Sequence, residues 1–383
     1  EAAAALIAAV REEPAPITPR RVAWLRTLAE TDERTRREIA AELERLGAER
    51  ADAPRSVRES LLLARTAVAA APDPLGAILP WVRSHGLSAR VLDAALAGAD
   101  EAELVRRGVA LVAADPAAAS PVADAVLWRT ADPAALRAAL ADAQSPAGRL
   151  LHAATVLEMG YPELVPPGLP ADADADAEIR TGFDALLAEA AAQRGDWAAY
   201  NAALDRLRQT AEPEGLPLLR ALVAGQRLAE AFPLARRIAE REPTPDAFIR
   251  VAALAGLAGS PEEQEQALRR AAELDPYAPE PLAGLIAMHS PGGALPDRER
   301  ARTVARTLGE RLPGSIQIAI LAAREQIGRG LLADAERTLL AAEGVRRDPE
   351  ALAMLAGVWA AAQARGDADA AVRGRDFLAR LAG

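Results

Sequence analysis

Apolar residues recur three and four positions apart along nearly the whole chain, which is the signature of an α-helix with one buried face. In the segment 331–342 (LLADAERTLLAA), the apolar positions that share one face are Leu332, Ala335, Leu339 and Ala342. The commonest residues are strong helix formers, and the alternating β-branched runs typical of strands are missing. The pattern therefore predicts an all-α fold.

The predicted helices are about 12–16 residues long, which is usual for globular proteins, and short breaks with Gly, Pro or Asp separate them. The clearest break is 160–178 (GYPELVPPGLPADADADAE), where proline removes a helical donor and biases the preceding residue away from helix. We therefore expect an N-terminal helical region at 1–160, a Pro- and Asp-rich linker or loop at 161–178, and a repeat array at 179–383. The break is compatible with a domain boundary or with an irregular loop inside one array.

A repeat follows this break. Glycines fall between two predicted helices at intervals of 30 to 38 residues, at Gly195, Gly225, Gly259, Gly292 or Gly293, Gly330 and Gly366. Prolines close the helix pairs at Pro243, Pro276, Pro313 and Pro349. Spacings of this size are typical of stacked helical hairpins, because one hairpin cannot bury its apolar face alone.

Over residues 180–383 the chain resembles the tetratricopeptide repeat (TPR) family. The segments 193–207 (QRGDWAAYNAALDRL), 329–343 (RGLLADAERTLLAAE) and 365–378 (RGDADAAVRGRDFL) are similar to the turn and second helix of such a repeat, and 267–276 (ALRRAAELDP) is similar to the end of its second helix. The resemblance implies an α-solenoid of stacked antiparallel helical hairpins, a TPR-like superhelix.

The same resemblance assigns packing positions. It implies small residues where helices cross, at Ala252, Ala323, Ala335 and Ala371, and large residues between them, at Phe248, Leu268 and Leu339. Trp359 departs from the family pattern, because it falls where the first helix usually carries a small residue. We expect the five tryptophans, which are spread at most one to a hairpin, to lie in hairpin cores.

Charge and composition exclude several functions. The net charge is −10 and every cationic residue is Arg, so Lys is absent, and Cys is absent too. A phosphate-loop lysine, a lysine Schiff base, a cysteine nucleophile, a disulfide and a thiolate metal site are therefore excluded. The negative charge argues against nucleic-acid binding, and no apolar run approaches the roughly 20 residues of a membrane span. The composition leaves the compartment open between cytoplasm and periplasm or cell envelope, and it is typical of a GC-rich bacterial genome.

The sequence offers little catalytic chemistry. His85, His152 and His289 are far apart and have no second ligand at helical spacing, so we expect no metal and no cofactor. Ser290 lies beside glycines but lacks the strand and the flanking glycines of a nucleophile elbow. Most Arg clusters have acidic partners nearby on the same helix; the run from 298 to 311 is the best candidate for an anionic partner.

These observations lead to a functional hypothesis. We expect a non-enzymatic scaffold that binds a peptide or protein segment on the concave surface that the resemblance implies. The candidate partner-binding residues there are Asp246, Arg250, Gln317, Arg324 and Gln363. The alternative is a structural or accessory subunit docked permanently in a larger assembly, possibly in the cell envelope. A third possibility is an enzyme with a site in its N-terminal half.

Overall fold

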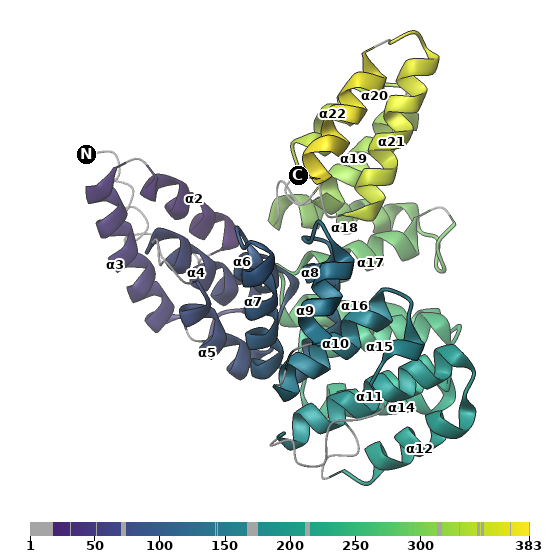
Figure 1. Ribbon diagram of the computed structural model, residues 1–383. Coiled ribbons are helices and arrows are strands. Elements are labelled where there is room, and N and C mark those ends of the chain that lie inside the picture. The colour runs from purple at the N-terminus through teal and green to yellow at the C-terminus, as the bar shows by residue number, and fades with distance from the viewer. Residues whose placement is uncertain are drawn as a thin grey trace. The chain divides into compact units, whose positions relative to one another are not determined.

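The all-α prediction is confirmed in a computed structural model of the chain (Figure 1). The structure describes residues 18–30, 32–50, 52–69, 74–141, 143, 145–166, 175–210, 215–290, 292–311, 316–328, 330–342, 345, 348–367 and 369–382. Within these residues it contains twenty-one α-helices, short 3₁₀ turns and no β-strand.

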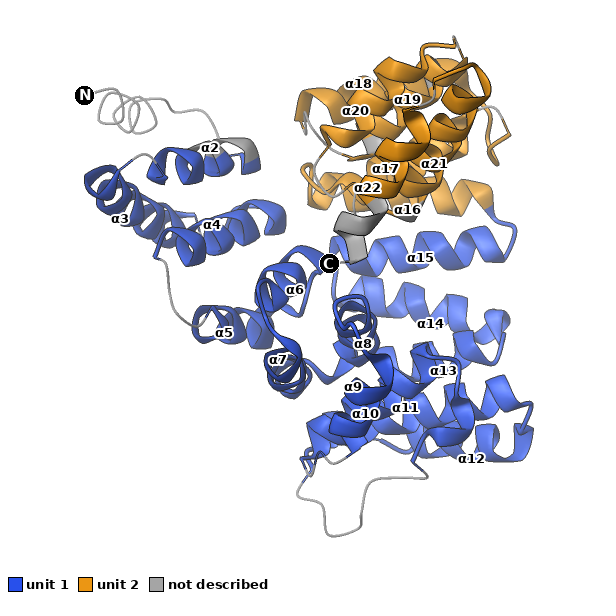
Figure 2. Cartoon of the chain, turned by 45° about the horizontal axis from the view of Figure 1, so that its top comes forward, with its two compact units in different colours: residues 1–260 blue, residues 261–383 orange. Residues whose placement is uncertain are grey.

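The chain forms two compact units, residues 1–260 and residues 261–383 (Figure 2). The first nine described helices of unit 1 are α2 (Pro19–Ala29), α3 (Glu33–Glu49), α4 (Arg55–Val68), α5 (Leu75–His85), α6 (Ala89–Leu96), α7 (Glu101–Ala114), α8 (Ala119–Leu127), α9 (Pro133–Ala141) and α10 (Pro146–Glu158). The 3₁₀ turns η1 (Pro116–Ala118) and η2 (Pro162–Leu164) follow α7 and α10. Five further helices complete the unit: α11 (Ala177–Arg194), α12 (Trp197–Arg208), α13 (Leu216–Ala224), α14 (Leu228–Arg241) and α15 (Pro245–Leu257).

Unit 2 contains seven described helices: α16 (Pro261–Leu274), α17 (Pro279–His289), α18 (Arg298–Arg311), α19 (Ile316–Gly328), α20 (Leu332–Leu340), α21 (Pro349–Ala364) and α22 (Ala370–Ala382). Helices that are neighbours in the chain pack against each other, as α17 does with α18 and α19 with α20. Helix α19 also packs against α21, so the first helices of successive pairs touch. Helix α11 contacts α12 and α13 in the same way in unit 1.

Short polar side chains and glycines set the ends of the helices. Asp176 and Asp196 accept hydrogen bonds from the backbone N–H groups of Ile179 and Ala199, which caps α11 and α12. The predicted glycine turns have left-handed backbones at Gly195, Gly259, Gly292, Gly330 and Gly366. These positive φ angles favour glycine, because a side chain would clash there.

The turn at 225–226 differs from this expectation. Its left-handed residue is Gln226, with φ 55°, and not Gly225. Gly225 is needed for a different reason, since a Cβ there would lie 2.2 Å from the hydroxyl oxygen of Tyr200. The Tyr200 hydroxyl donates to the carbonyl oxygen of Ala221 over 3.1 Å. This glycine therefore lets α12 approach α13 closely.

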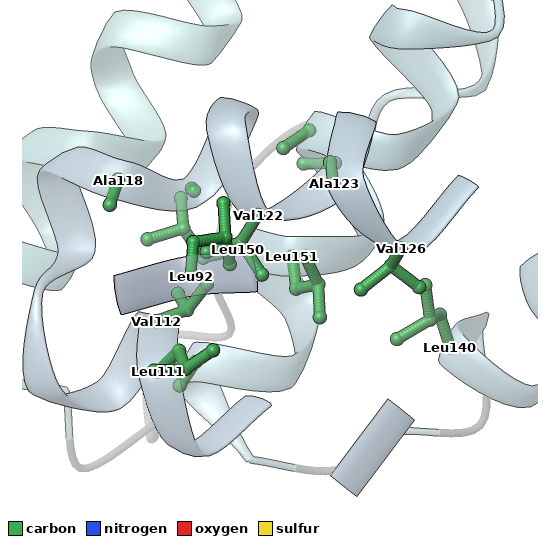
Figure 3. Packing of buried hydrophobic residues seen from close by; sticks show 14 of the residues in the cluster. Leu92, Leu111, Val112, Ala118, Val122, Ala123, Val126, Leu140, Leu150 and Leu151 are labelled. Carbon is green, nitrogen blue, oxygen red and sulfur yellow. The ribbon is translucent and has the colours of Figure 1, made fainter. Parts of the chain in front are cut away.

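A core cluster of unit 1 is made of aliphatic side chains from α5 to α11 (Figure 3). Leu150 and Leu151 of α10 are fully buried there, and Ile179 and Phe183 of α11 belong to the same cluster. The helices on either side of 161–178 therefore share one core, and the chain divides into compact units at 260/261. Helix α10 ends at Glu158, just before the left-handed Gly160, and the apolar packing continues past this end, because α10 and α11 contact each other directly.

The core of α19 to α22 in unit 2 contains many alanines. Ala323, Ala335 and Leu339 are fully buried there. Trp359 is buried too, and Gly374 of α22 makes room for it, because a Cβ there would lie 3.0 Å from the indole ring. The departure at Trp359 is thus accommodated by a glycine on the neighbouring helix.

Candidate functional site

The predicted partner-binding residues lie on three helices. Asp246 and Arg250 are on α15 in unit 1, whereas Gln317 and Arg324 are on α19 and Gln363 is on α21 in unit 2. Arg250, Arg324 and Gln363 are exposed, and the side chain of Gln317 lies outside the described part of the chain. In unit 2, Arg324 forms an ion pair with Glu350 of α21.

Asp246 is engaged by a residue that sequence reasoning did not single out. Arg55, at the first position of α4, donates from Nη1 to Asp246 Oδ2 over 2.7 Å. Its Nε donates to Glu59 Oε1 over 2.9 Å, and its Nη2 is 3.4 Å from the carbonyl oxygen of Gly86. One guanidinium thus meets acceptors from α4, from the C-cap of α5 and from α15. The separation of 191 residues hid this contact from sequence analysis.

Arg58, one turn after Arg55, belongs to a second cluster with α5. Its Nη1 is 3.0 Å from His85 Nε2, and His85 Nδ1 is 3.2 Å from the carbonyl oxygen of Trp81. A carbonyl only accepts, so we assign the ring proton to Nδ1 and let Nε2 accept from Arg58. The His85 ring stacks on Trp81 at 3.9 Å, and the Arg58 guanidinium lies 5.5 Å from the Trp81 ring centroid. This cluster joins α4 to α5 and leaves His85 no lone pair for a metal.

A polar cluster also lies among α8, α10, α11 and α13. Arg220 donates to Glu189 over 2.6 Å and to the hydroxyl of Ser120. Burial raises the pKa of Glu158, and the neighbouring Glu189 raises it further. Burial, reinforced by Arg137, lowers the pKa of His152, which favours its neutral form.

Unit 2 has a pocket of about 690 Å³ between α16, α17 and α18. Its lining residues are Arg269, Leu285, His289, Asp297, Glu299, Arg300, Thr303 and Val304. Buried His289 has Nδ1 at 2.9 Å from the carbonyl oxygen of Leu295 and Nε2 at 3.4 Å from Glu265 Oε1. The same Glu265 oxygen accepts from Arg269 over 2.5 Å and from Arg300 over 3.3 Å. The volume suits a small molecule or one peptide side chain.

The Arg run that begins at 298 is partly committed to acidic partners at this pocket. Arg300 pairs with Asp297 over 3.2 Å as well as with Glu265. The backbone N–H of Arg300 donates to Asp297, which together with a second backbone bond lowers the pKa of that carboxyl. These pairs reduce the charge that Arg300 can offer to an anionic partner, so the prediction for this run depends on its other arginines.

The tryptophan prediction is wrong at two positions. Trp359 lies in a core, but Trp128 and Trp197 are exposed, the latter with 54% of its surface accessible. Trp128 follows the end of α8, and Trp197 follows the turn after α11. Trp81 is half-buried against His85, and the side chain of Trp24 lies outside the described residues. Exposed tryptophans of this kind are typical anchors of protein interfaces.

Metal binding and membrane insertion place their own demands on side chains and helices. Within the residues that the structure describes, no three His, Asp or Glu side chains converge closely enough to hold a metal ion. Among the described helices, none combines the length and the apolar character that crossing a membrane requires.

Comparison with models of known protein families finds no match for this chain, and comparison with curated proteins finds no relative. The function therefore has to be inferred from the residues and contacts described above.

Proposed function

We propose that this protein is a non-enzymatic scaffold that binds a peptide or protein segment, with the helix pairs of each unit stacked as a TPR-like solenoid. The observation that carries the proposal is the repeated packing of sequence-adjacent helices, together with contacts between the first helices of successive pairs, α11 with α13 and α19 with α21. Stacking of this kind lines up first helices side by side and leaves an extended surface for a ligand.

The candidate surface in each unit is polar. On α15, Arg250 is exposed one turn after Asp246, and in unit 2 exposed Arg324 and Gln363 belong to α19 and α21. Arginine, glutamine and aspartate offer several donors and acceptors that suit the backbone of an extended peptide. Side chains on the second helices α14 and α20 serve as controls, because the proposed ligand surface is formed by the first helices.

The proposal is tested by selecting peptides from a random display library on the full chain. Selected peptides are then measured by fluorescence anisotropy against Arg250→Glu and Arg324→Glu. The matched controls are Arg241→Glu on α14 and Arg337→Glu on α20, which reverse an exposed charge on a second helix. The proposal expects at least about a tenfold loss of affinity, near 1.4 kcal/mol, in at least one of the two first-helix variants and in neither control. A library that yields no binder, or equal losses in all four variants, contradicts it.

A second candidate function is favoured by exposed apolar residues at the ends of helices in unit 1. Trp197 is the first residue of α12, and Leu257 is the last residue of α15. Of the Leu257 surface, 66% is accessible. Such residues suit a subunit docked permanently in a larger assembly, because desolvated aromatic anchors dominate stable interfaces. A partner that stays bound in high salt and is lost on Trp197→Ser would favour this function over peptide capture.

A further inference from the structure

We propose that Glu59, Asp246 and the carbonyl oxygen of Gly86 form a guanidinium-binding site, which the chain's own Arg55 fills in this structure and which takes an arginine side chain of a bound peptide when Arg55 is displaced. The inference rests on the proposed function, because it assigns a ligand side chain to α15. The chemistry of the ligand is visible in the structure, since Arg55 occupies the site.

The acceptors fit the planar, forked guanidinium group. Arg55 uses Nε for Glu59, Nη1 for Asp246 and Nη2 for Gly86, so each of its three nitrogens meets a different acceptor. Only 19% of the Arg55 side chain and 6% of the Glu59 side chain are exposed, so the ion pair is largely shielded from solvent. A lysine ammonium presents one nitrogen and cannot reach three acceptors that are spread around a plane.

The helix dipole explains the position of only one of the two charged residues, Asp246 and Arg55. Asp246 lies in the first turn of α15, where the helix dipole favours an acidic residue. Arg55 lies in the first turn of α4, where the same dipole disfavours a cation. The position of Arg55 is therefore explained by the acceptors around it, in particular Asp246 and the Gly86 carbonyl, which belong to other elements.

Asp246 is also the accessible edge of the site. Its side chain is 48% exposed, and ion pairs with one exposed partner are weak and screened by salt. If Arg55 leaves Asp246, it keeps an ion pair on its own helix, because Glu59 is four residues away. An incoming arginine can therefore take over the contacts to Asp246 and to Gly86 and share Glu59 with Arg55, because a carboxylate has two oxygens that can each accept a hydrogen bond.

The test empties the site and supplies the ligand as a probe. Arg55→Ala is titrated with acetyl-Gly-Arg-Gly-amide and, separately, with acetyl-Gly-Lys-Gly-amide, and binding is followed by chemical-shift changes at Asp246 and Gly86. The inference expects Arg55→Ala to bind the arginine peptide at least about tenfold tighter than the wild-type chain. It expects a similar preference over the lysine peptide, and loss of binding in Arg55→Ala/Asp246→Asn.

A matched control shows whether any unpaired carboxylate would bind the probe. Arg206→Ala frees Asp184, the acceptor of a 2.7 Å ion pair between α12 and α11, and is expected to bind no better than wild type. Circular dichroism checks that Arg55→Ala folds, and Arg55→Gln, which keeps part of the side-chain stem, replaces it if it does not.

The inference is overturned if the emptied site binds the arginine peptide no tighter than wild type, or binds the lysine peptide equally well. If the emptied site fails while the display-selected peptides still lose affinity on Arg250→Glu, this inference fails and the proposed function stands. If those peptides also bind every variant equally, both fail.

Discussion

One core cluster of unit 1 and one of unit 2 are built differently. In unit 1 the cluster from α5 to α11 consists largely of leucine and valine, with Leu150 and Leu151 at its centre (Figure 3). In unit 2 the cluster from α19 to α22 consists largely of alanine, with Trp359 as its largest member. Each buried alanine removes little apolar surface from water, and the hydrophobic contribution to the free energy of folding is roughly proportional to the apolar area buried. The cluster from α19 to α22 therefore depends more on contacts between neighbouring helices.

A buried polar group supplies part of that dependence. The indole N–H of Trp359 on α21 donates to Glu336 Oε1 on α20 over 2.9 Å. Arg373 on α22 donates to both oxygens of Glu336, over 2.8 and 3.0 Å. Three consecutive helices are therefore joined at one carboxylate. The comparison teaches that a core of small residues gains specificity from a shared polar contact.

The largest expected effect comes from Ala335→Arg in unit 2. Ala335 is fully buried on α20, so the substitution places an unpaired charge in a close-packed core. We expect a loss of more than about 4 kcal/mol and unfolding of the neighbouring α19 and α21. Hydrogen exchange followed by mass spectrometry should show lost protection across α19 to α21. Ala341→Arg, at an exposed position just after α20, should leave protection unchanged.

Leu150→Ala tests the core of unit 1. Leu150 is fully buried on α10, and removing its side chain should cost about 2–5 kcal/mol. Because Phe183 of α11 shares this core, hydrogen exchange should rise on both sides of 161–178. Leu257→Ala, at an exposed leucine, should change stability by less than about 0.5 kcal/mol. Increased exchange confined to residues before 161 would show that α11 folds independently of α10.

Glu336→Ala tests the polar contact that distinguishes unit 2. The substitution leaves the Trp359 indole N–H without its acceptor and Arg373 without its principal partner, which should cost about 1–3 kcal/mol in chemical unfolding. Asp334→Ala on the same helix removes an exposed carboxylate paired with Arg337, and it should have almost no effect. Equal effects of the two variants would remove the physical difference that we draw between the cores.

Acidification should produce the smallest effect. Hydrogen bonds from Arg373 hold the pKa of Glu336 below its usual value of 4.5. The stability that this lowered pKa contributes is present above pH 4.5 and is lost as the pH falls through the lowered pKa, because the proton then binds the unfolded chain better. The thermal stability of unit 2 should decrease between pH 7 and pH 3, and this decrease should be smaller in Glu336→Gln. If the decrease in stability is the same in Glu336→Gln, other carboxylates cause it.

The helices and most of the glycine turns between them were predictable from local residues. Apolar spacing predicted the helices, and most interhelical glycines have the left-handed backbone that their residue type suggests. The turn at Gln226 was missed because Gly225 is required by the ring of Tyr200, which comes from another helix. Trp128 and Trp197 were misplaced because the spacing of an aromatic residue does not reveal whether a neighbouring helix covers it.

The candidate site was less predictable. Asp246 could be chosen as a polar residue on a first helix, but its partner Arg55 lies 191 residues away and follows from the fold alone. The buried contact of Glu336 was hidden for a similar reason, because Arg373 is 37 residues further on. Local patterns indicate which face of a helix is polar, and only the packing shows which polar residues already have partners.

The most direct test of the account is backbone hydrogen exchange of the full chain with and without a saturating display-selected peptide. The account predicts that the peptide slows exchange at the first helices, on α15 or on α19 and α21, and that Arg250→Glu or Arg324→Glu removes this protection. Protection confined to the exposed helix ends around Trp197 and Leu257, with α15, α19 and α21 unchanged, would contradict it.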